Sequence, residues 1–463
     1  TALDAITTGD NNTAVGYAAL TGNTTGISNT ATGYYSLQSN TTGSGNTASG
    51  IRSLEGNTEG DYNTAFGNQS LKANTTGDNN TALGYLSLLS NTTGTLNTAS
   101  GVSALAANTS GANNTATGAL VLSSNTTGLY NTGSGASALF SNTTGDYNIA
   151  TGALALQYNT TGSGNAAIGV SALASNTTGT RNLAIGYRAY DNADTENDNL
   201  AIGYDALGGA IAGGAFNIAI GNYSMDANTS GSFNTAVGYN ALTDNTTGTK
   251  NTAIGSNALW NNTTGSSNTA SGYYSMLNNT TGSSNTASGY EALKANTTGG
   301  SNTASGYGAL KANTTGTRNL AIGMGAYDGA DTEDDNLAIG YDALGGSIAG
   351  GEYNVAIGNY SLDANTTGDH NSAVGHNALS ANTTGSGNTA SGAYALYTNT
   401  TGGYNSAFGI NSLDANTTGD HNSAVGKNAL SANTTGSGNT ASGAYALYTN
   451  TTCLLYTSPS PRD

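Results

Sequence analysis

One 17-residue unit repeats along this chain, and the repeat constrains the fold more than any other feature of the sequence. The Asn of an N-T-A-x-G motif occurs 26 times between Asn12 and Asn439. Successive copies are 17 residues apart, except for two steps of 18 that begin at Asn199 and Asn336. The consensus is N-T-A-x-G-x-x-[AS]-L-x-x-N-T-T-G-x-x. A fixed period of this length is typical of solenoids, in which each repeat is one structural coil.

The composition alone would suggest a disordered chain, but the period argues against disorder. Of 463 residues, 68 are Gly and only 8% are charged, which in an aperiodic sequence indicates low complexity. With a formal net charge of −17 the chain has little to neutralise phosphates, so we expect no nucleic-acid partner. No apolar run approaches the ~20 residues of a membrane helix, and we expect no membrane span in this fragment.

The repeat favours short strands over helices. Each unit has two Gly and two Asn residues, which would break every helix. Segments such as 235–237 and 200–202 are typical of strands between turns. A coil of this length has room for two or three such strands, and stacked coils would form parallel sheets about 4.8 Å apart. The predicted fold is therefore an all-β, parallel β-solenoid of about 26 coils of 17 residues, about 125 Å long.

Two rows of the repeat are candidates for the interior. The small Ala of N-T-A is present in every copy but one, which has Gly133 instead, and Leu occupies its position in 22 copies. Small and large residues in alternation can fill a thin core in layers. The remaining copies have Met or Tyr at the Leu position, namely Met225, Met276, Tyr190 and Tyr327.

The Asn and Gly rows are predicted to shape the coil. Asn side chains can stack their amides from coil to coil, and Asn also tolerates left-handed corners. Gly relieves a tight corner of a Cβ clash, and N-T-T-G is typical of an outer turn. In the first coils, the predicted structural ladder consists of Asn12, Asn29, Asn46, Asn63, Gly16, Gly33, Leu20 and Leu37.

The residue after the Ala points to the opposite side of the strand. This position is richest in aliphatic residues within 168–254 and 322–374. One Ala and one Leu per unit make a small core for a monomer. Burial of the second row between chains would therefore favour a homo-oligomer, most simply a trimer. The alternative is a wider monomeric coil that encloses both rows.

The last eleven residues do not follow the repeat. Cys453 stands where Gly is expected, and the string CLLYTSPSPRD at 453–463 resembles the translated read-through of a sequencing adapter. We therefore treat 1–452 as one continuous repeat domain and 453–463 as a non-native tail. Because the first unit starts in mid-repeat, we expect a fragment that is open at both ends.

Units such as 217–224 (NIAIGNYS) and 354–358 (NVAIG) resemble the head repeats of trimeric autotransporter adhesins. This resemblance implies a trimeric, left-handed parallel β-roll on the bacterial surface that binds host matrix or other cells. Similar N-T-A-x-G arrays occur in phage tail-fibre-like proteins. The unit departs from the usual head repeat in its N-T-T-G segment, which looks like an insertion, and in copies that replace Ile by Ser, such as Ser271, Ser288 and Ser305.

An acidic segment replaces the N-T-T-G turn in two coils, which lie in the near-identical blocks 180–231 and 317–368. Hard oxygen ligands at this density could bind calcium, the only cofactor that we consider. The spacing is not that of an EF-hand and no G-G-x-G-x-D array occurs, so a solvated corner at a block boundary is the alternative. The candidate ligands are Asp191, Asp194, Glu196, Asp198, Asp328, Asp331, Glu333 and Asp335.

Tyrosine recurs directly after the first Gly, and on three consecutive coils these side chains would form an outer stripe. Exposed aromatic side chains suit a glycan or a host-surface protein, although stacking between coils or a subunit contact would explain them equally well. The three histidines lack a nucleophile or a cluster of metal ligands, so we assign no catalytic residue. The stripe is Tyr273, Tyr290 and Tyr307, and the histidines are His370, His376 and His421.

The duplicated blocks indicate that the number of coils varies easily, as expected of a spacer or a multivalent display. We therefore expect an extracellular structural or adhesive rod, either an adhesin head or a fibre shaft, on a bacterial surface or a virion, and not an enzyme. Weak contacts would become useful through multivalency. One alternative is an ice-binding solenoid with its Thr rows facing outward, and a second is a phage tail-fibre shaft.

Overall fold

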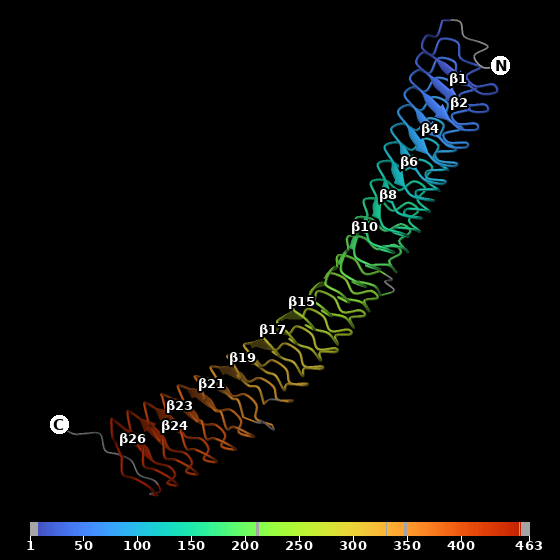
Figure 1. The fold of residues 1–463 in the computed structure, drawn as a ribbon. Coiled ribbons are helices and arrows are strands. Elements are labelled where there is room, and N and C mark those ends of the chain that lie inside the picture. The colour runs from blue at the N-terminus through green and yellow to red at the C-terminus, as the bar shows by residue number, and fades with distance from the viewer. Residues whose placement is uncertain (1–7, 210–212, 330, 347–349, 453, 455–463) are drawn as a thin grey trace. The chain divides into compact units, whose positions relative to one another are not determined.

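The computed structural model describes residues 8–209, 213–329, 331–346, 350–452 and 454. The tail 453–463 therefore lies, apart from Leu454, outside the described residues. The chain divides into two compact units, 1–232 and 233–463, and each is described by itself. Both are all-parallel β-solenoids with one coil for each 17-residue unit and, in the described residues, no helix (Figure 1). The predicted fold class is confirmed.

Each coil contributes one three-residue strand, made of the T-A-x segment of its repeat. The strands of unit 1 are β1 (Thr13–Val15), β2 (Thr30–Thr32), β3 (Thr47–Ser49), β4 (Thr64–Phe66), β5 (Thr81–Leu83), β6 (Thr98–Ser100), β7 (Thr115–Thr117), β8 (Thr132–Ser134), β9 (Ile149–Thr151), β10 (Ala166–Ile168), β11 (Leu183–Ile185), β12 (Leu200–Ile202) and β13 (Ile218–Ile220).

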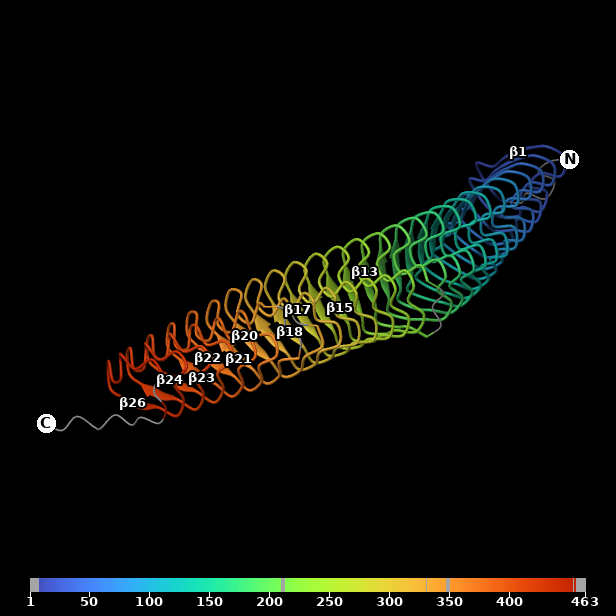
Figure 2. The same ribbon diagram turned by 90° about the horizontal axis from the view of Figure 1, so that it is seen from below.

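Unit 2 is built in the same way, and its coils run from yellow to red in Figure 2. Its strands are β14 (Thr235–Val237), β15 (Thr252–Ile254), β16 (Thr269–Ser271), β17 (Thr286–Ser288), β18 (Thr303–Ser305), β19 (Leu320–Ile322), β20 (Leu337–Ile339), β21 (Val355–Ile357), β22 (Ser372–Val374), β23 (Thr389–Ser391), β24 (Ser406–Phe408), β25 (Ser423–Val425) and β26 (Thr440–Ser442).

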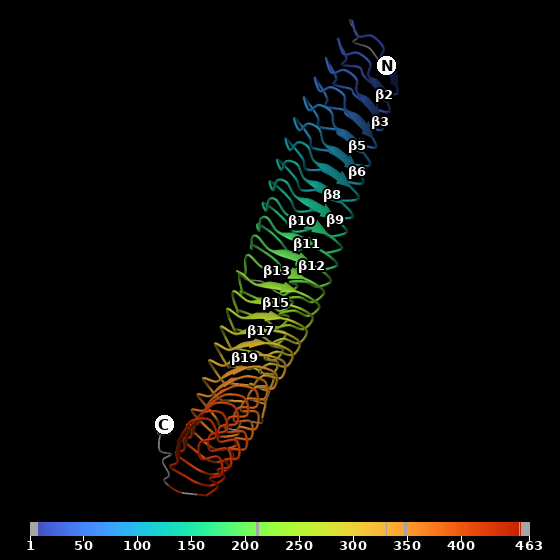
Figure 3. The ribbon, with the colours of Figure 1, turned by 90° about the vertical axis from the view of Figure 1, so that its left-hand side faces the viewer.

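Within each unit, successive strands pair in parallel and in register, so that equivalent positions of the repeat lie side by side (Figure 3). Ala31 pairs with Ala48, for example, and Ala270 pairs with Ala287. The two 18-residue steps keep this register, because β12 still pairs with β13 and β20 with β21, Ala to Ala. The extra residue is therefore accommodated outside the strands.

One strand per coil is fewer than the two or three for which the coil had room. The reason lies at the Leu position, where the backbone is left-handed: φ is +49° at Leu37 and +53° at Leu54. Left-handed backbone is uncommon for a residue other than Gly and cannot continue a strand. Leu37 is nevertheless held there, because its side chain is buried and its N–H donates to the Ser53 carbonyl at 3.0 Å. The expectation that the Asn rows supply left-handed corners is wrong in this respect.

The core has three apolar or small rows, one more than predicted. The strand-centre Ala and the Leu are fully buried, as Ala31 and Leu37 illustrate. The [AS] position is also fully buried, as at Ala19 and Ser36, and the Ser36 hydroxyl donates to the Gly33 carbonyl at 3.1 Å. The side chain at this position approaches the strand centre of the next coil, as Val121 approaches Gly133, so a small residue suits a strand centre that carries Ala.

Two different asparagine ladders link the coils. In the row of the second Asn, the Asn40 amide donates to Asn23 Oδ1 at 2.8 Å and to the Gly43 carbonyl at 2.8 Å. In the row of the first Asn, the N–H of Asn29 donates to Asn12 Oδ1 at 2.9 Å, while its amide donates to Gly43 at 2.8 Å. The predicted amide-to-amide stacking thus holds for the second row, whereas the first row mainly uses the main chain. Because these side chains are almost all fully buried, each bond is shielded from water.

The two glycines of the repeat are required for different reasons. Gly16 has φ +133°, a conformation that L side chains rarely adopt, and a Cβ there would lie 2.5 Å from the Gly33 carbonyl oxygen. Gly43 has an ordinary φ, but a Cβ would lie 2.5 Å from the Gly60 oxygen and 2.6 Å from Asn40 Oδ1. The first glycine therefore permits a backbone conformation, and the second permits the close approach of the asparagine ladder.

Candidate functional surfaces

The outer face of the strands is the surface that repeats along both units. In β2 and β16 the central Ala is buried, while the residues on either side of it are exposed. The position after the Ala points outward as predicted, with Val15 60% exposed and Ile254 47% exposed. The alternative of a wider coil that encloses both rows is therefore wrong. The strand centre already fills the interior, so the flanking residues alternate to the solvent side.

Three consecutive coils of unit 2 carry the same outward sequence, T-A-S-G-Y, on β16, β17 and β18. The three predicted stripe tyrosines are brought together here. Tyr273 and Tyr290 stack with ring centroids 5.5 Å apart and planes at 21°, and Tyr290 and Tyr307 stack at 5.0 Å and 3°. We call this face the TASGY face; it consists of Thr269, Ser271, Tyr273, Thr286, Ser288, Tyr290, Thr303, Ser305 and Tyr307.

A small charge cluster adjoins the TASGY face. Glu291 is buried, and its two carboxylate oxygens contact Lys294 at 2.6 Å and Lys311 at 2.7 Å. Hydrogen bonds from Lys294 and Lys311, which outweigh desolvation, hold the pKa of Glu291 below its ordinary value. The Lys294 ammonium also lies over the ring of Tyr274, 5.2 Å from its centroid. Sequence reasoning missed this cluster, because its members come from different positions of two neighbouring units.

The acidic segments that replace the N-T-T-G turn in two coils are called the acidic corners. In them, four of the predicted calcium ligands accept hydrogen bonds from side chains of the neighbouring coil. Arg181 donates to both oxygens of Asp198, at 2.7 and 2.8 Å, and Arg318 does the same to Asp335, at 2.7 and 2.7 Å. Hydrogen bonds from these guanidinium groups lower the pKa of both carboxyl groups. The other two carboxylates, Asp194 and Asp331, accept hydrogen bonds from the Thr177 and Thr314 hydroxyls.

The corner glutamates are buried and bind main-chain N–H groups. Glu196 accepts from Asp194 and Thr195 at 3.1 Å each and from Gly213 at 2.9 Å. Glu333 repeats this arrangement, with 3.0 Å to Asp331 and 2.9 Å to Gly350. Each glutamate therefore ties its own corner to the next coil, at the place where the consensus has the second Gly.

The last two predicted ligands are half-buried or buried beside the corner. Asp191 contacts Arg188 at 2.8 Å, whereas burial and the nearby Asp342 raise the pKa of the Asp328 carboxyl. Among the described residues, no three His, Cys, Asp or Glu side chains converge closely enough to hold a metal ion. The corner carboxylates are thus used mostly in contacts within and between coils.

The acidic corners also interrupt the second asparagine ladder. Ala193 occupies the Asn position, and Asn176 Oδ1 in the preceding coil is buried without a hydrogen-bond partner among the described residues. The larger Tyr190 replaces Leu in this coil, is fully buried, and its hydroxyl accepts from the Asn199 amide at 2.6 Å. Burial raises the pKa of the Tyr190 hydroxyl. Tyr327 makes the same contact with Asn336, so the two Tyr substitutions noted in the repeat accompany the ladder breaks.

The histidines lie on the surface. His370 stacks on Tyr353 with centroids 5.0 Å apart and planes at 7°, and His421 stacks on Tyr404 at 5.2 Å and 5°. His376 makes an edge contact with Tyr394 at 5.5 Å. Among the described residues, none of these rings belongs to a group of three or more His, Cys, Asp or Glu side chains that could hold a metal ion.

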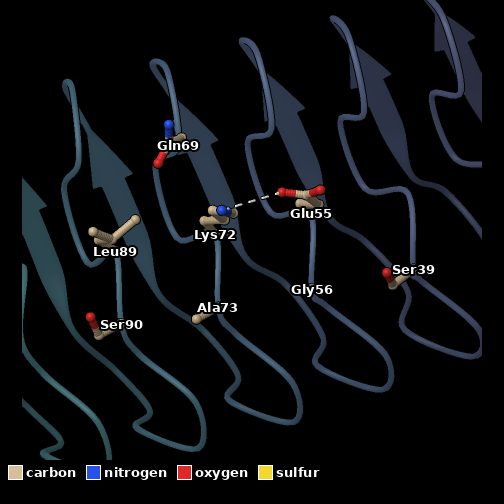
Figure 4. A pocket seen from close by; sticks show the side chains of 8 residues that line it. All are labelled: Ser39, Glu55, Gly56, Gln69, Lys72, Ala73, Leu89 and Ser90. Carbon is tan, nitrogen blue, oxygen red and sulfur yellow. Dashed lines mark ion pairs between the residues drawn. The ribbon is translucent and has the colours of Figure 1, made fainter.

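A groove crosses four coils of unit 1 and is drawn in Figure 4. It has a volume of about 530 Å³, and Ser39, Gly56 and Ala73 line it from the same repeat position of three successive coils. The Glu55 carboxylate points toward Lys72, at 3.8 Å, and is 3.9 Å from Arg52. The groove has both polar and apolar walls, which are formed by Ser39, Glu55, Gly56, Gln69, Lys72, Ala73, Leu89 and Ser90.

The fold and these surfaces define a β-solenoid repeat protein with hydrogen-bonded asparagine ladders. Comparison of the chain with protein-family models and with curated protein sequences finds no match. Within the described part of the chain there is no helix that is long and apolar enough to cross a membrane.

Proposed function

We propose that the protein is an extracellular structural and adhesive repeat protein, an adhesin head or a fibre shaft, that presents one surface many times. The observation that carries this proposal is the in-register outer face, on which equivalent positions of the repeat recur once per coil in both units. Weak contacts to such a face add through multivalency. The resemblance of 217–224 to adhesin head repeats and the N-T-A-x-G arrays of tail-fibre-like proteins support the same class of function.

An outward aliphatic segment in each unit supports a homo-oligomer. Both residues that flank the buried Ala are aliphatic in β11, β12 and β13 of unit 1 and in β19, β20 and β21 of unit 2. Such a surface gains free energy when a second chain covers it. We favour a trimer, in which light scattering would give three times the chain mass of 45.7 kDa. A stable monomer at micromolar concentration would contradict the trimer.

The adhesive role is tested with beads that carry the full chain at increasing density. We expect retention on mucin-coated and collagen-coated surfaces that rises more steeply than the density, because several copies bind at once. The matched control is a bead coated with an unrelated acidic protein of the same net charge. Equal retention of both kinds of bead, or retention of neither, would refute adhesion.

A second function is favoured by one specific observation, the threonine row of unit 1. Eight consecutive strands, β1 to β8, begin with Thr, and seven parallel pairings hold these residues in register on the outer face. Regularly spaced outward Thr side chains are the arrangement expected of an ice-binding surface. Thermal hysteresis at micromolar protein would support this function, and its absence would remove it. The residues are Thr13, Thr30, Thr47, Thr64, Thr81, Thr98, Thr115 and Thr132.

A further inference from the structure

We propose that the TASGY face binds a neutral, extended β-1,4-linked glycan that lies along the coils, with one sugar for each coil. The inference rests on the proposed adhesive function and names the class of ligand for one of its surfaces. It is drawn from three features of β16, β17 and β18: their hydroxyl groups, their stacked rings and their lack of charge.

The hydroxyl groups of the face form a regular grid. Thr269 pairs with Thr286, which pairs with Thr303, and the serines two residues further on pair in the same way. All three serines are exposed, and in the described structure none of their hydroxyls bonds to another residue. Each coil therefore offers Thr, Ser and Tyr hydroxyls across the face, and each hydroxyl can both donate and accept. A sugar ring has hydroxyls around its edge and needs partners of this kind.

The stacked tyrosines set the spacing along the face. Their ring centroids are 5.5 and 5.0 Å apart, close to the advance of one sugar in an extended β-1,4-linked chain. Because neighbouring rings lie against both faces of Tyr290, this ring presents its edge and its hydroxyl to solvent. We therefore expect hydrogen bonding by the phenol groups, with apolar contact at the ring edges, and not the stacking of a sugar on an open ring face.

Apolar side chains bound the face at both ends. The coil before it has Ile254 at the position of the serines, and the coil after it has Ile322 there and Met324 at the position of the tyrosines. All three are exposed. The preceding coil keeps hydroxyl residues at the other two positions, Thr252 and Ser256. The complete set of Thr, Ser and Tyr is therefore three coils long, which predicts a site for three consecutive sugars.

The charge around the face favours a neutral glycan. None of the nine side chains of the face is charged at neutral pH, and in the adjoining cluster both oxygens of Glu291 are already paired with lysines. The whole chain has a net charge of −17, which repels polyanions. Acidic glycans are thus disfavoured, although the two lysines lie nearby.

Isothermal titration calorimetry of the full chain tests the proposal, with cello-, chito-, xylo- and manno-oligosaccharides of two, three and six sugars. We expect at least one series to bind. Its affinity should rise about tenfold from two sugars to three, as one further neutral hydrogen-bonded group would give, and should change little from three sugars to six. The failure of all four series to bind, or affinity that grows evenly with length, would overturn the three-sugar site.

Two variants locate the binding on the face without disturbing the core. Tyr290→Phe combined with Ser288→Ala removes two exposed hydroxyls and keeps the stacked ring, and we expect affinity to fall about tenfold or more. Tyr147→Phe is the matched control. Tyr147 stacks on Tyr130 with ring centroids 5.1 Å apart and planes at 3°, but this pair lies outside the TASGY face, so the control variant should bind like the parent protein. Unchanged affinity in the double variant would overturn the proposal.

The bead assay separates this inference from the proposed function. If the beads adhere but no oligosaccharide binds, the glycan site is wrong and the adhesive role stands. If neither the beads nor the oligosaccharides give binding, both proposals fail. Adhesion that the binding oligosaccharide blocks at its calorimetric concentration would support both.

Discussion

A compensating pair in the core of unit 1 gives a prediction that can be worked from the structure. Gly133 replaces the strand-centre Ala in β8, and Val121 replaces the small [AS] residue in the preceding coil. A Cβ at Gly133 would overlap the Val121 Cγ1 methyl, whereas its next neighbours, the Ala138 oxygen and Leu122 Cδ1, would be 3.7 and 3.8 Å away. The valine methyl therefore occupies the space that the alanine methyl fills elsewhere.

Each single change to this pair should destabilise the coil. Gly133→Ala overpacks a close-packed site, which costs about 2 kcal/mol of the local free energy of unfolding. Val121→Ala removes two buried methyl groups and leaves a gap, which costs about 2 kcal/mol as well. The double variant restores the consensus pair, so we expect it to lose less than about 1 kcal/mol, which is about 3 kcal/mol better than additive.

Amide hydrogen exchange of the full chain, read by mass spectrometry over 114–138, is the suitable assay, because a repeat array need not unfold in one step. Each single variant should accelerate exchange there about thirtyfold, and the double variant less than about fivefold. The coils of unit 2 serve as an internal control. If the free energy of unfolding that the double variant loses equals the sum of the two single losses, within about 0.5 kcal/mol, the compensation is refuted.

Three further predictions concern the ladders, the glycines and an ion pair. Asn91→Ala leaves its two buried ladder partners short of a hydrogen bond and should lower the local free energy of unfolding, measured by hydrogen exchange, by about 2–4 kcal/mol. The control Ser90→Ala should change this free energy little, and equal effects of the two variants would contradict a stabilising role of the ladder. Gly84→Ala, with φ +128° and a Cβ 2.6 Å from a carbonyl oxygen, should lower the melting temperature far more than Gly164→Ala. Gly164 has φ +70°, close to the +57° of Arg181 at the same position of the next coil, and the nearest neighbour of its Cβ would be 3.8 Å away, so a similar loss in both would be contrary evidence. The Glu291 carboxyl should titrate below its ordinary pKa of 4.5 by NMR. Because its pKa is lowered in the folded state, the stability that the ionised carboxylate adds above pH 4.5 is lost as the pH falls through the folded pKa. Titration at or above 4.5 would show the lysine contacts to be absent.

The period of the sequence was sufficient to predict the stacking of the coils. Because an Ala recurs every 17 residues, the strand centre could be assigned to the core, and the alternation of side chains along a strand placed the following residue on the opposite side. Whether that second side was enclosed by a wider coil stayed open. Val15 and Ala31 confirm this assignment. The amide ladder of Asn23 and Asn40 also followed from the repetition of Asn at one position of the unit, although the N-T-T-G segment was interpreted as an outer turn and these Asn side chains are buried.

The features that sequence reasoning missed depend on geometry that a consensus does not carry. No propensity places Leu37 in a left-handed conformation, because the preference comes from burial and from the hydrogen bond to the next coil. The acidic corners were interpreted as a surface feature, and their link with the ladder break at Ala193 and with the buried Tyr190 became visible only in three dimensions. The signal for this link was present, since the Tyr and the acidic segment occur together in both blocks.

The central claim is that each 17-residue unit advances the stack by one strand spacing with equivalent positions in register. Nitroxide labels at Thr235 in β14 and Ser372 in β22, in a Cys453→Ser background, test it by pulsed electron resonance in unit 2. Eight steps of about 4.8 Å predict a narrow distance distribution near 38 Å, and a label pair at Thr235 and Thr303, four steps apart, should give about half of that. A broad distribution, or a distance that does not double from four coils to eight, would contradict the account.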